Sequence, residues 1–270
     1  MYNLTDMHLH SKYSWDAQQT LSEIISRAKE NNYKYIGVTE HVDFFDWHPK
    51  KYDKFEYGPL TEEVNRIKEG FPGLRKGAEI GEPHLFPERF KNFLEGREFD
   101  YLVGSIHHVN NITPVYDKYF HSYPSLEEAY RAYFKEELAL VKFGGFDVAA
   151  HLDIVHRRGA AFYDGYSYEK FKDEIDEILK VMVDKNIGLE INTSGLRYNA
   201  KDILPTASVV KKYIDMGGAV ITVGSDAHTQ KDIFYGIEKA YEILDGLGVK
   251  ELTVFEKRKA VKIPIKTVNK

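Results

Sequence analysis

The sequence predicts an α/β protein that folds as a (β/α) barrel in a single domain. Short, apolar, β-branched segments alternate about seven times with segments of helical periodicity, a pattern typical of parallel strands covered by helices. The repeat of roughly 30 to 40 residues continues without a linker, which favours a barrel over an open sheet. Metal-binding side chains follow the end of nearly every expected strand. These features also point to where the function lies.

The composition suits one large domain. The chain has 270 residues, 43% of them hydrophobic, and its 16 Phe and 19 Tyr can fill a sizeable core. The formal net charge of -5 argues against nucleic-acid binding by a basic surface. Without cysteine, disulfides, thiolate metal ligands and a cysteine nucleophile are excluded. Asp6 leaves no room for a preceding signal peptide, and no apolar run is long enough to cross a membrane. We therefore expect a soluble cytoplasmic protein.

The expected elements follow from local periodicity and from helix caps. Strands are expected over residues 2–7, 35–39, 74–78, 101–106, 146–150, 187–192 and 219–223, with a β-like stretch at 252–255. Helices are expected over residues 21–28, 62–69, 87–94, 125–141, 168–185, 207–216 and 234–247. Thr20 is placed to cap the first helix, and Ser125 with Glu128 forms a capping box for the fourth. Seven or eight barrel strands remain possible.

The first strand carries the first chemical signal. Asp6, His8 and His10 are spaced two residues apart, so their side chains share one face of the strand. Two imidazoles with a carboxylate behind them are a natural start to a divalent metal site. A lone His-x-His pair is more often a polar feature of an edge strand. The later strands change this balance.

The ends of the expected strands repeat the same residue types. In chain order these ends hold His8 and His10, Glu40 and His41, Glu79, His107 and His108, His151 and Asp153, Glu190 and Asn192, and Asp226 and His228. Seven of the 11 histidines lie there. Because the carboxyl ends of barrel strands converge on one face, we expect these side chains to form a metal site.

The expected ligands are too many for one metal ion. A catalytic zinc takes three protein ligands and keeps an open position, so two or three ions that share carboxylates account for this set more simply. Glu79 and Asp226 are the expected bridges. Nitrogen and oxygen ligands without sulfur fit zinc, iron or manganese. Clustered divalent ions of this kind serve phosphate-ester hydrolysis.

The ordered motifs resemble those of a known family. They are Asp6-x-His8-x-His10, Thr39-Glu40-His41, Glu79, Ser105-x-His107-His108, His151-x-Asp153, Asn192-Thr193-Ser194-Gly195 and Gly224-Ser225-Asp226-Ala227-His228. Over nearly the whole chain, this order is similar to the PHP (polymerase and histidinol phosphatase) family, and within it to the stand-alone histidinol-phosphatases. The resemblance implies a distorted, TIM-like (β/α)7 barrel with a trinuclear metal centre. It also implies hydrolysis of L-histidinol phosphate to L-histidinol and phosphate in histidine biosynthesis.

The resemblance also assigns ligands to three metals. It implies a first metal held by His8, His10, Glu79 and Asp226 and a second held by Glu79, His107 and His151. A third would be held by His41, His228 and Asp16, where some relatives have a histidine in place of the aspartate. His108 matches none of the shared ligands and is expected near the substrate.

Catalysis and substrate binding complete the expected site. We expect a metal-bridging hydroxide to attack phosphorus, with Asp226 or His228 handling the proton and Glu79 holding the metals. Arg197 is the first candidate for the phosphate, followed by Arg158 and Arg157. Aromatic loops at 44–57 and 116–123 either close over the substrate or pack on themselves. The sequence leaves two rival functions open: hydrolysis of another ester, such as a nucleotide or phosphotyrosine, and a non-catalytic metal-binding role.

Overall fold

A parallel β-barrel forms the centre of the molecule. The structure is a computed structural model that describes residues 1–47 and 55–267. Its main sheet has seven parallel strands in sequence order. They are β1 (Thr5–Leu9), β2 (Tyr35–Asp43), β3 (Leu74–Gly81), β4 (Tyr101–Ser105), β5 (Val148–Ala149), β6 (Gly188–Asn192) and β7 (Ile221–Gly224). The predicted (β/α)7 architecture is therefore confirmed.

The two edge strands of the sheet meet and almost close the barrel. Just beyond the end of β7, the Asp226 N–H donates to the His8 carbonyl at 2.7 Å, and the His10 N–H donates to the Ala227 carbonyl at 3.0 Å. A parallel bridge joins Leu9 to Ala227. The closure therefore brings the first and the last metal-binding motifs of the chain together.

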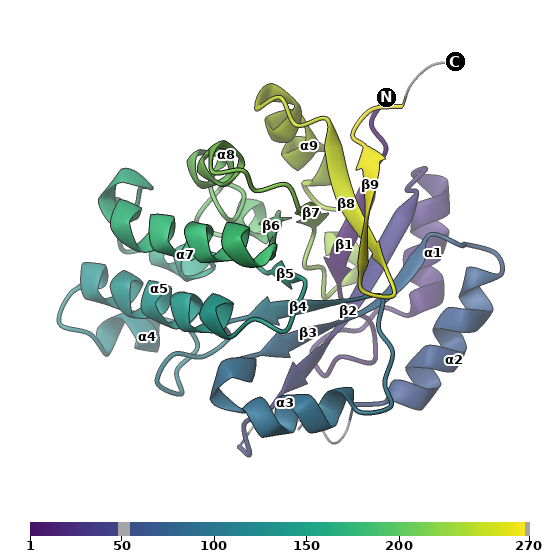
Figure 1. Cartoon of the computed structure of the whole chain (residues 1–270), viewed down its shortest axis with the longest axis horizontal. Coiled ribbons are helices and arrows are strands. Elements are labelled where there is room, and N and C mark those ends of the chain that lie inside the picture. Colours follow the sequence, from purple (N-terminus) through teal and green to yellow (C-terminus); the bar gives the residue numbers. More distant parts are fainter. Residues whose placement is uncertain (48–54, 268–270) are drawn as a thin grey trace.

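Helices surround the barrel on its outside (Figure 1). The α-helices are α1 (Leu21–Glu30), α2 (Tyr57–Lys68), α3 (Pro87–Leu94), α4 (Asp117–His121), α5 (Leu126–Phe143), α6 (Val155–Gly159), α7 (Lys172–Lys185), α8 (Ala207–Asp215) and α9 (Ile237–Gly246). Short 3-10 turns are η2 (Pro83–Leu85), η3 (Glu169–Phe171), η4 (Ser194–Arg197) and η5 (Gln230–Asp232). The helices bury apolar faces against the sheet, which is why the strands are apolar on both sides.

The first helix shows how the local sequence sets these elements. The Thr20 hydroxyl accepts a hydrogen bond from the Glu23 N–H, and the Glu23 carboxylate accepts one from the Thr20 N–H. This capping box satisfies donors that the first turn leaves free. Ser125 likewise accepts a hydrogen bond from the Glu128 N–H at the start of α5. Both predicted N-cap residues are confirmed, but of the two only Thr20 with Glu23 forms the full reciprocal box; Ser125 with Glu128 forms half of the predicted one.

Two strands run further than their sequences suggest. β2 and β3 stay paired without interruption from Ile36 with Leu74 to Asp43 with Gly81, and His41 lies directly opposite Glu79. These residues therefore project from within paired strands rather than from the loops that follow. The backbone pairing extends these strands through polar positions where an apolar run alone predicts an end.

Other boundaries differ modestly from the predictions. β1 starts and ends later than residues 2–7, and α2 starts before residue 62. The aromatic segment after residue 116 contains the short helix α4, in which Tyr119 and Phe120 are buried. Of the first aromatic loop, residues 48–54, including Tyr52, lie outside the described residues.

The C-terminal β-like stretch is part of a separate hairpin. β8 (Glu251–Glu256) pairs antiparallel with β9 (Lys259–Pro264), and both lie outside the barrel sheet (Figure 1). The Arg258 N–H donates to the Asp100 carbonyl at 2.8 Å, and its guanidinium pairs with Asp147. Because these aspartates precede β4 and β5, the hairpin lies at the amino ends of the strands, opposite the metal-binding motifs. Seven barrel strands, not eight, are therefore correct.

One large side chain fills the barrel interior near this end. Tyr101 is fully buried, stacks on Phe255 of the hairpin and donates its hydroxyl proton to the Met7 carbonyl. A Cβ atom at Gly37 would lie 2.0 Å from the Tyr101 hydroxyl oxygen, so this position needs glycine. The barrel is therefore a packed core rather than a channel.

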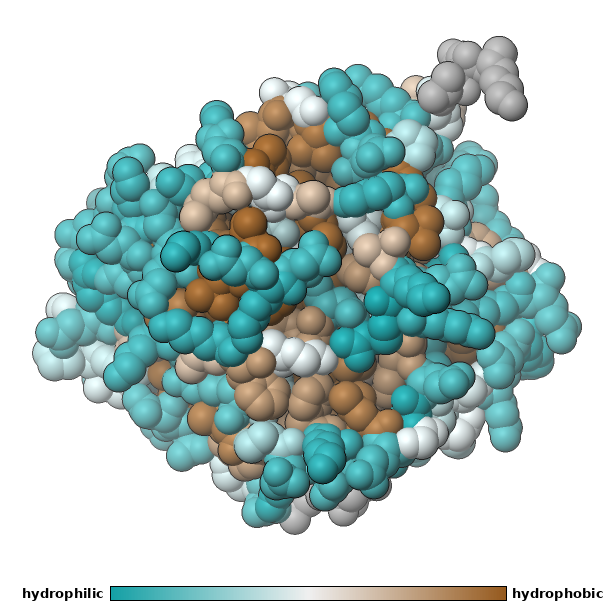
Figure 2. Space-filling model, in the orientation of Figure 1, coloured by the Kyte–Doolittle hydropathy of each residue, from teal (hydrophilic) through white to brown (hydrophobic). Residues whose placement is uncertain are grey.

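The surface is mainly polar. Hydrophilic residues cover most of the face shown in Figure 2. In the described part of the chain, none of the helices has the length and apolar character needed to span a bilayer.

Candidate metal centre

Glu79 lies at the centre of the site. This fully buried carboxylate of β3 is surrounded by five imidazoles. The shortest nitrogen–oxygen distances are 3.4 Å for His8, 3.4 Å for His10, 3.0 Å for His41, 3.1 Å for His107 and 3.1 Å for His151. Its Oε1 atom faces His107 and His151, whereas Oε2 faces the other three rings. The two oxygens can therefore serve ions on both sides, as a bridging carboxylate must.

The first strand provides two rings that face each other. The Nε2 atoms of His8 and His10 are 3.2 Å apart, and both rings are fully buried. Asp226 Oδ1 lies 3.9 Å from His8 Nε2 and 3.6 Å from His10 Nε2. These three residues form one of the groups whose ligand atoms lie within 4.8 Å of one another.

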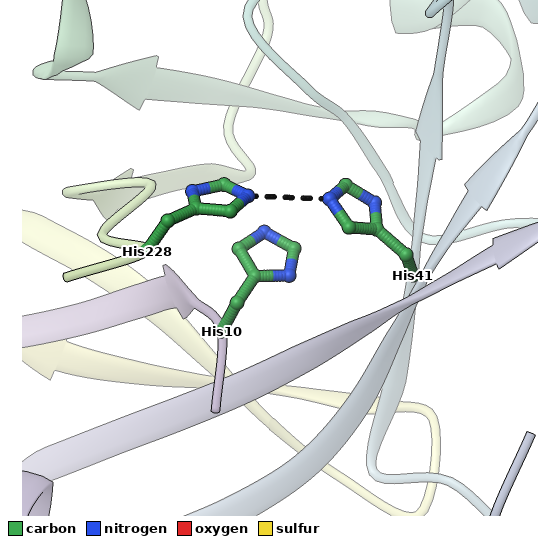
Figure 3. A group of neighbouring side chains, drawn as sticks. All are labelled: His10, His41 and His228. Carbon is green, nitrogen blue, oxygen red and sulfur yellow. Dashed lines mark hydrogen bonds between the residues drawn. The ribbon is translucent and has the colours of Figure 1, made fainter. Parts of the chain in front are cut away.

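A second group comes from three different segments of the chain. His10, His41 and His228 point toward a common space, and the Nε2 atoms of His41 and His228 are 3.2 Å apart (Figure 3). Asp16 Oδ2 lies 3.5 Å from His41 Nε2 and 3.4 Å from His228 Nε2. The predicted third-metal residues are thus brought together, with Asp16 contributed by the loop after β1.

Hydrogen bonds to Nδ1 turn three of these rings so that Nε2 faces the site. His8 Nδ1 lies 2.6 Å from Glu190 Oε1, and His107 Nδ1 lies 3.1 Å from Asp43 Oδ1. His228 Nδ1 lies 3.1 Å from the carbonyl oxygen of Asp226. Because each partner is an acceptor, Nδ1 carries the proton and Nε2 is left for a cation. This donor set therefore fits divalent metal ions.

The electrostatics of the site also favour positive charge beside its carboxylates. Burial disfavours charge on His8, but the carboxylates of Glu190 and Glu79 outweigh burial and raise its pKa well above the usual value. Burial is likewise outweighed at His41, where Glu79 and Asp16 raise the pKa to about 10. The pKa of Glu79 is well below its usual value, because His8, His107 and His41 outweigh its burial. A bound cation would supply this positive charge in place of the protons on the Nε2 atoms.

The backbone is strained at two of the candidate ligands. Asp226 has a φ of 52° and His151 a φ of 21°, in the region that side chains with a Cβ atom rarely adopt. The His151 N–H donates to Glu190 Oε2 at 2.9 Å, which holds this conformation. Gly224 lies beside them, and a Cβ atom there would be 2.4 Å from His8 Cβ and 2.6 Å from Glu190 Oε1. Only glycine lets β7 pass this close.

A cavity opens above the imidazoles. Its volume is about 360 Å³, and its lining includes Asp16, His41, Glu79, Asp226 and His228. Predicted ligands His107 and His151 also line it, as does His108, whose ring packs edge-on against Trp47. His108 therefore lies where the prediction of a substrate contact requires it.

The arginines differ from their predicted arrangement. Arg197 Nη1 and Nη2 donate to the carbonyl oxygens of Ser225 and Asp226 at 2.7 and 2.9 Å, so this side chain supports the backbone of the site and does not line the cavity. Arg158 pairs with Asp117 at 2.5 Å and also lies outside the cavity lining. Arg157 does line it, and its Nη1 lies 3.4 Å from Asp226 Oδ2. Of the three candidate arginines, Arg157 is the one that reaches the cavity.

The prediction that Asp6 is the carboxylate behind His8 and His10 is wrong. The sequence suggests Asp6, but Asp6 Oδ1 accepts hydrogen bonds from the backbone N–H of Ser225 at 2.9 Å and of His8 at 3.3 Å. Burial raises its pKa to about 7. Glu190 is the carboxylate that contacts Nδ1 of the His8 ring, on the side away from the other ligands. Asp6 therefore organises the backbone where β1 meets the segment after β7.

Asp43 is a site residue that the sequence prediction missed. It lines the cavity and orients His107 from the end of β2. Its position two residues after His41 places both side chains on one face of a strand. That signal was hidden because the expected strand ended at residue 39.

With this geometry established, the similarities to known proteins are informative. The model of the PHP domain family matches residues 6–194. The chain belongs to the PHP domain family. Individual relatives match over nearly the full chain. A probable histidinol-phosphatase of Clostridium acetobutylicum is 33% identical, and the match covers 94% of this chain and 97% of that protein. The histidinol-phosphatase of Lactococcus lactis is 28% identical over 93% of both chains.

A solved histidinol phosphate phosphatase structure has the same fold. The crystal structure of histidinol phosphate phosphatase from Lactococcus lactis, complexed with zinc, L-histidinol and phosphate, superimposes with a TM-score of 0.87 at 25% sequence identity. The match covers 96% of this chain and 99% of the other. The agreement therefore extends over the whole (β/α)7 barrel.

Proposed function

We propose that this protein is a metal-dependent phosphatase that hydrolyses L-histidinol phosphate to L-histidinol and phosphate. The observation that carries the proposal is the cluster of five imidazoles around Glu79 at the carboxyl end of the barrel. The relatives named histidinol-phosphatase match this PHP-family chain over nearly its full length. The cluster supports phosphate-ester hydrolysis, and the relatives support the choice of ester.

The site would hold two to three divalent ions, of zinc, manganese or iron. The first ion would bind His8, His10, Glu79 and Asp226, and the second Glu79, His107 and His151. The third would bind Asp16, His41 and His228. Among the described residues, three of the four groups of ligand atoms within 4.8 Å support this division: His8 with His10 and Asp226, Glu79 with His107 and His151, and His10 with His41 and His228. The fourth group, His41 with Asp43 and His107, lies between the second and third positions. Without sulfur ligands, the chemistry leaves these three metals as candidates.

The bound ions supply Lewis acidity, which activates water and neutralises charge on the phosphoryl oxygens. The chain itself supplies orientation and proton transfer. Both expected proton carriers line the cavity, but His228 has Nδ1 on the Asp226 carbonyl and Nε2 directed at the third metal position. Asp226 turns Oδ1 toward His8 and His10 and Oδ2 toward Arg157, so Oδ2 is the atom placed to take a proton from water or to give one to the leaving alcohol. The carbonyl contacts of Arg197 hold Asp226 in place for this role.

Substrate recognition would divide between two sets of lining residues. Arg157 lies beside Asp226 and would bind the phosphate through its guanidinium group. Its stacking on Tyr198, 4.7 Å from the ring centroid, limits the directions in which the guanidinium can point. His108 and Trp47, which pack edge-on against each other in the cavity lining, offer aromatic rings suited to the imidazole and ammonium groups.

Phosphate release from a panel of monoesters tests the proposal. The purified protein should contain two to three metal ions per chain and should prefer L-histidinol phosphate to nucleotides, phosphotyrosine and p-nitrophenyl phosphate by orders of magnitude in kcat/KM. Glu79→Ala should abolish turnover for every ester, because it removes the shared ligand. A metal-loaded protein that prefers another ester would keep the chemistry and change the substrate. A wild-type protein that cannot be loaded with metal would overturn the proposal.

A further inference from the structure

A buried hydroxyl links two candidate ligands that belong to different metal positions. The Ser14 Oγ atom lies 3.1 Å from His10 Nδ1 and accepts a hydrogen bond from the His41 N–H at 3.1 Å. It also donates to Glu40 Oε2 at 2.5 Å. Ser14 is 3% exposed and Glu40 is fully buried, so water does not compete for these bonds.

The direction of each hydrogen bond follows from counting donors. The Glu40 carboxylate accepts bonds from the Ser11 N–H, the Ser11 hydroxyl and the Ser14 hydroxyl, so it acts only as an acceptor. The single Ser14 proton is therefore used toward Glu40, and both lone pairs of its oxygen accept bonds. One comes from the His41 N–H and the other must come from His10 Nδ1–H.

This arrangement has a consequence for His10. A proton on Nδ1 leaves the Nε2 lone pair pointing at Glu79 Oε2, 3.4 Å away, and at Asp226 Oδ1, 3.6 Å away. The opposite tautomer would place a proton where the metal binds. Ser14 thus sets the tautomer of a ligand to the first metal and the backbone position of a ligand to the third.

The same loop reaches the remaining parts of the third position. Asp16 lies two residues after Ser14, and the Gln18 N–H donates to the His228 carbonyl at 3.2 Å. The Gln19 side-chain amide donates to the carbonyl oxygens of His10 and Ala227 at 2.6 and 2.8 Å. Residues 11–19 are therefore fastened to the barrel by contacts with the ligand segments themselves.

We propose that Ser14, held by Glu40, is a positioning residue for the metal ligands His10 and His41. This inference rests on the proposed metal assignment but not on the identity of the ester. Its physical basis is a hydrogen-bond chain in which the Glu40 carboxylate orients the Ser14 hydroxyl, and the hydroxyl orients the His10 imidazole and the His41 backbone amide. The expected role is to raise metal affinity, as partners behind metal ligands commonly do by 10- to 100-fold.

Zinc titration against a competing chelator, without any phosphate ester, tests this proposal. We expect Ser14→Ala to bind zinc about 10- to 100-fold more weakly than the wild type. Glu40→Gln tests the bond direction with little change in shape, because its amide can donate to Ser14 and turn the Ser14 proton toward His10. It should weaken zinc binding to a similar extent. Added zinc should restore much of the activity of both variants.

Two controls separate positioning from general damage. Ser26→Ala removes a serine that also donates to a glutamate, Glu30, but on the exposed face of α1, and it should bind zinc like the wild type. Ser14→Thr keeps the hydroxyl and should recover zinc affinity relative to Ser14→Ala.

The outcomes distinguish this proposal from the proposed function. If Ser14→Ala and Glu40→Gln both bound zinc within twofold of the wild type, the positioning role of Ser14 would be overturned. A folded Ser14→Thr that binds no better than Ser14→Ala would also overturn it, because the hydroxyl would then be irrelevant. If Ser14→Ala does not fold, the near-isosteric Glu40→Gln decides the matter alone. A wild-type protein that binds zinc but prefers another ester would change only the substrate assignment.

Discussion

Some single residues in this site contact two candidate ligands. Glu190 contacts the His8 ring with Oε1 and accepts the His151 N–H with Oε2. It therefore ties a candidate ligand of the first metal to one of the second, although it would contact neither ion. Buried carboxylates that accept two or three donors are fixed in orientation, so the ligands they hold are fixed as well. The precision of the site thus depends on residues outside the ligand set.

Arg157 and its neighbour Arg158 provide a matched test of phosphate binding. Arg157→Ala should lower kcat/KM by about 10- to 100-fold, because a charged hydrogen bond to phosphate is worth about 1.5–3 kcal/mol. Arg158→Ala removes the same charge from a surface pair with Asp117 and should change kcat/KM less than threefold. Steady-state kinetics measures both. Equal losses in the two variants would contradict the assignment of Arg157.

His156 should make the fold less stable in acid. Its ring is partly buried beside the Tyr130 hydroxyl, and burial lowers its pKa to about 4, below the usual 6.5. The unfolded chain therefore binds more protons between these values, so the free energy of unfolding falls as pH drops from 6.5 to 4. The loss is at most about 3 kcal/mol, at about 1.4 kcal/mol per pH unit.

Urea unfolding of the wild type and of His156→Gln at several pH values measures this effect. The glutamine can still accept the Tyr130 hydroxyl proton, but it does not titrate. The difference in stability between the two proteins should therefore change between pH 6.5 and pH 4. Parallel curves over this range would show that His156 does not contribute, since loss of metal affects both proteins alike.

At the level of elements, the extended pairing of β2 with β3 decides which side chains reach the site. Eight successive residue pairs place His41 opposite Glu79 and carry Asp43 to the cavity rim. Side chains alternate between the two faces of β2, so Glu40 points away from the cavity and toward Ser11 and Ser14 in the loop between β1 and α1. One strand therefore supplies a ligand, the partner of another ligand and the support of a loop.

The C-terminal hairpin should stabilise the barrel from its amino end. Phe255 is 3% exposed and stacks on Tyr101, so Phe255→Ala should cost about 3–5 kcal/mol of unfolding free energy. Val261→Ala, on the exposed strand of the same hairpin, should cost less than about 1 kcal/mol. Denaturant unfolding measures both variants. If Phe255→Ala were no worse than Val261→Ala, the hairpin would not be part of the core.

At the scale of the whole molecule, the candidate metal site lies where the first and last strands meet and close the barrel. The Asp226 N–H to His8 carbonyl bond joins the first strand to the segment after the last, and the candidate ligands His8, His10, Asp226 and His228 lie at this seam. Ions that bind several strand ends stabilise the native state over the unfolded chain, because the unfolded chain does not hold the ligands together. Metal binding and global stability should therefore be coupled.

Removal of metal should lower the melting temperature on the order of 10 °C. An ion present at 1,000 times its Kd contributes about 4 kcal/mol, and about 2–4 °C corresponds to 1 kcal/mol in domains approaching this size. Calorimetry with and without a chelator measures the shift, and added zinc should reverse it. Glu79→Ala should show little chelator-dependent shift. A wild-type melting temperature insensitive to chelator would contradict the coupling.

The sequence alone was enough to predict the barrel and the convergence of its candidate metal ligands. Apolar strands alternating with amphipathic helices require a parallel sheet covered on its outer face, and the carboxyl ends of such strands meet. The histidines and acids that follow the strands could therefore be predicted to converge, from His8 to His228, without coordinates. The family motifs supported this prediction because their order along the chain mirrors the order of the strands.

The tertiary structure decided which groups stand behind the ligands. Asp6 and Glu190 are both acids near strand ends, but only the backbone path of β7 past Gly224 brings Glu190 to the His8 ring. Adjacent arginines point to different surroundings, so Arg157 lines the cavity and Arg158 does not. Periodicity specifies the face of an element, whereas a contact 3 Å long depends on the packing of segments distant in sequence, and short-range patterns do not encode it.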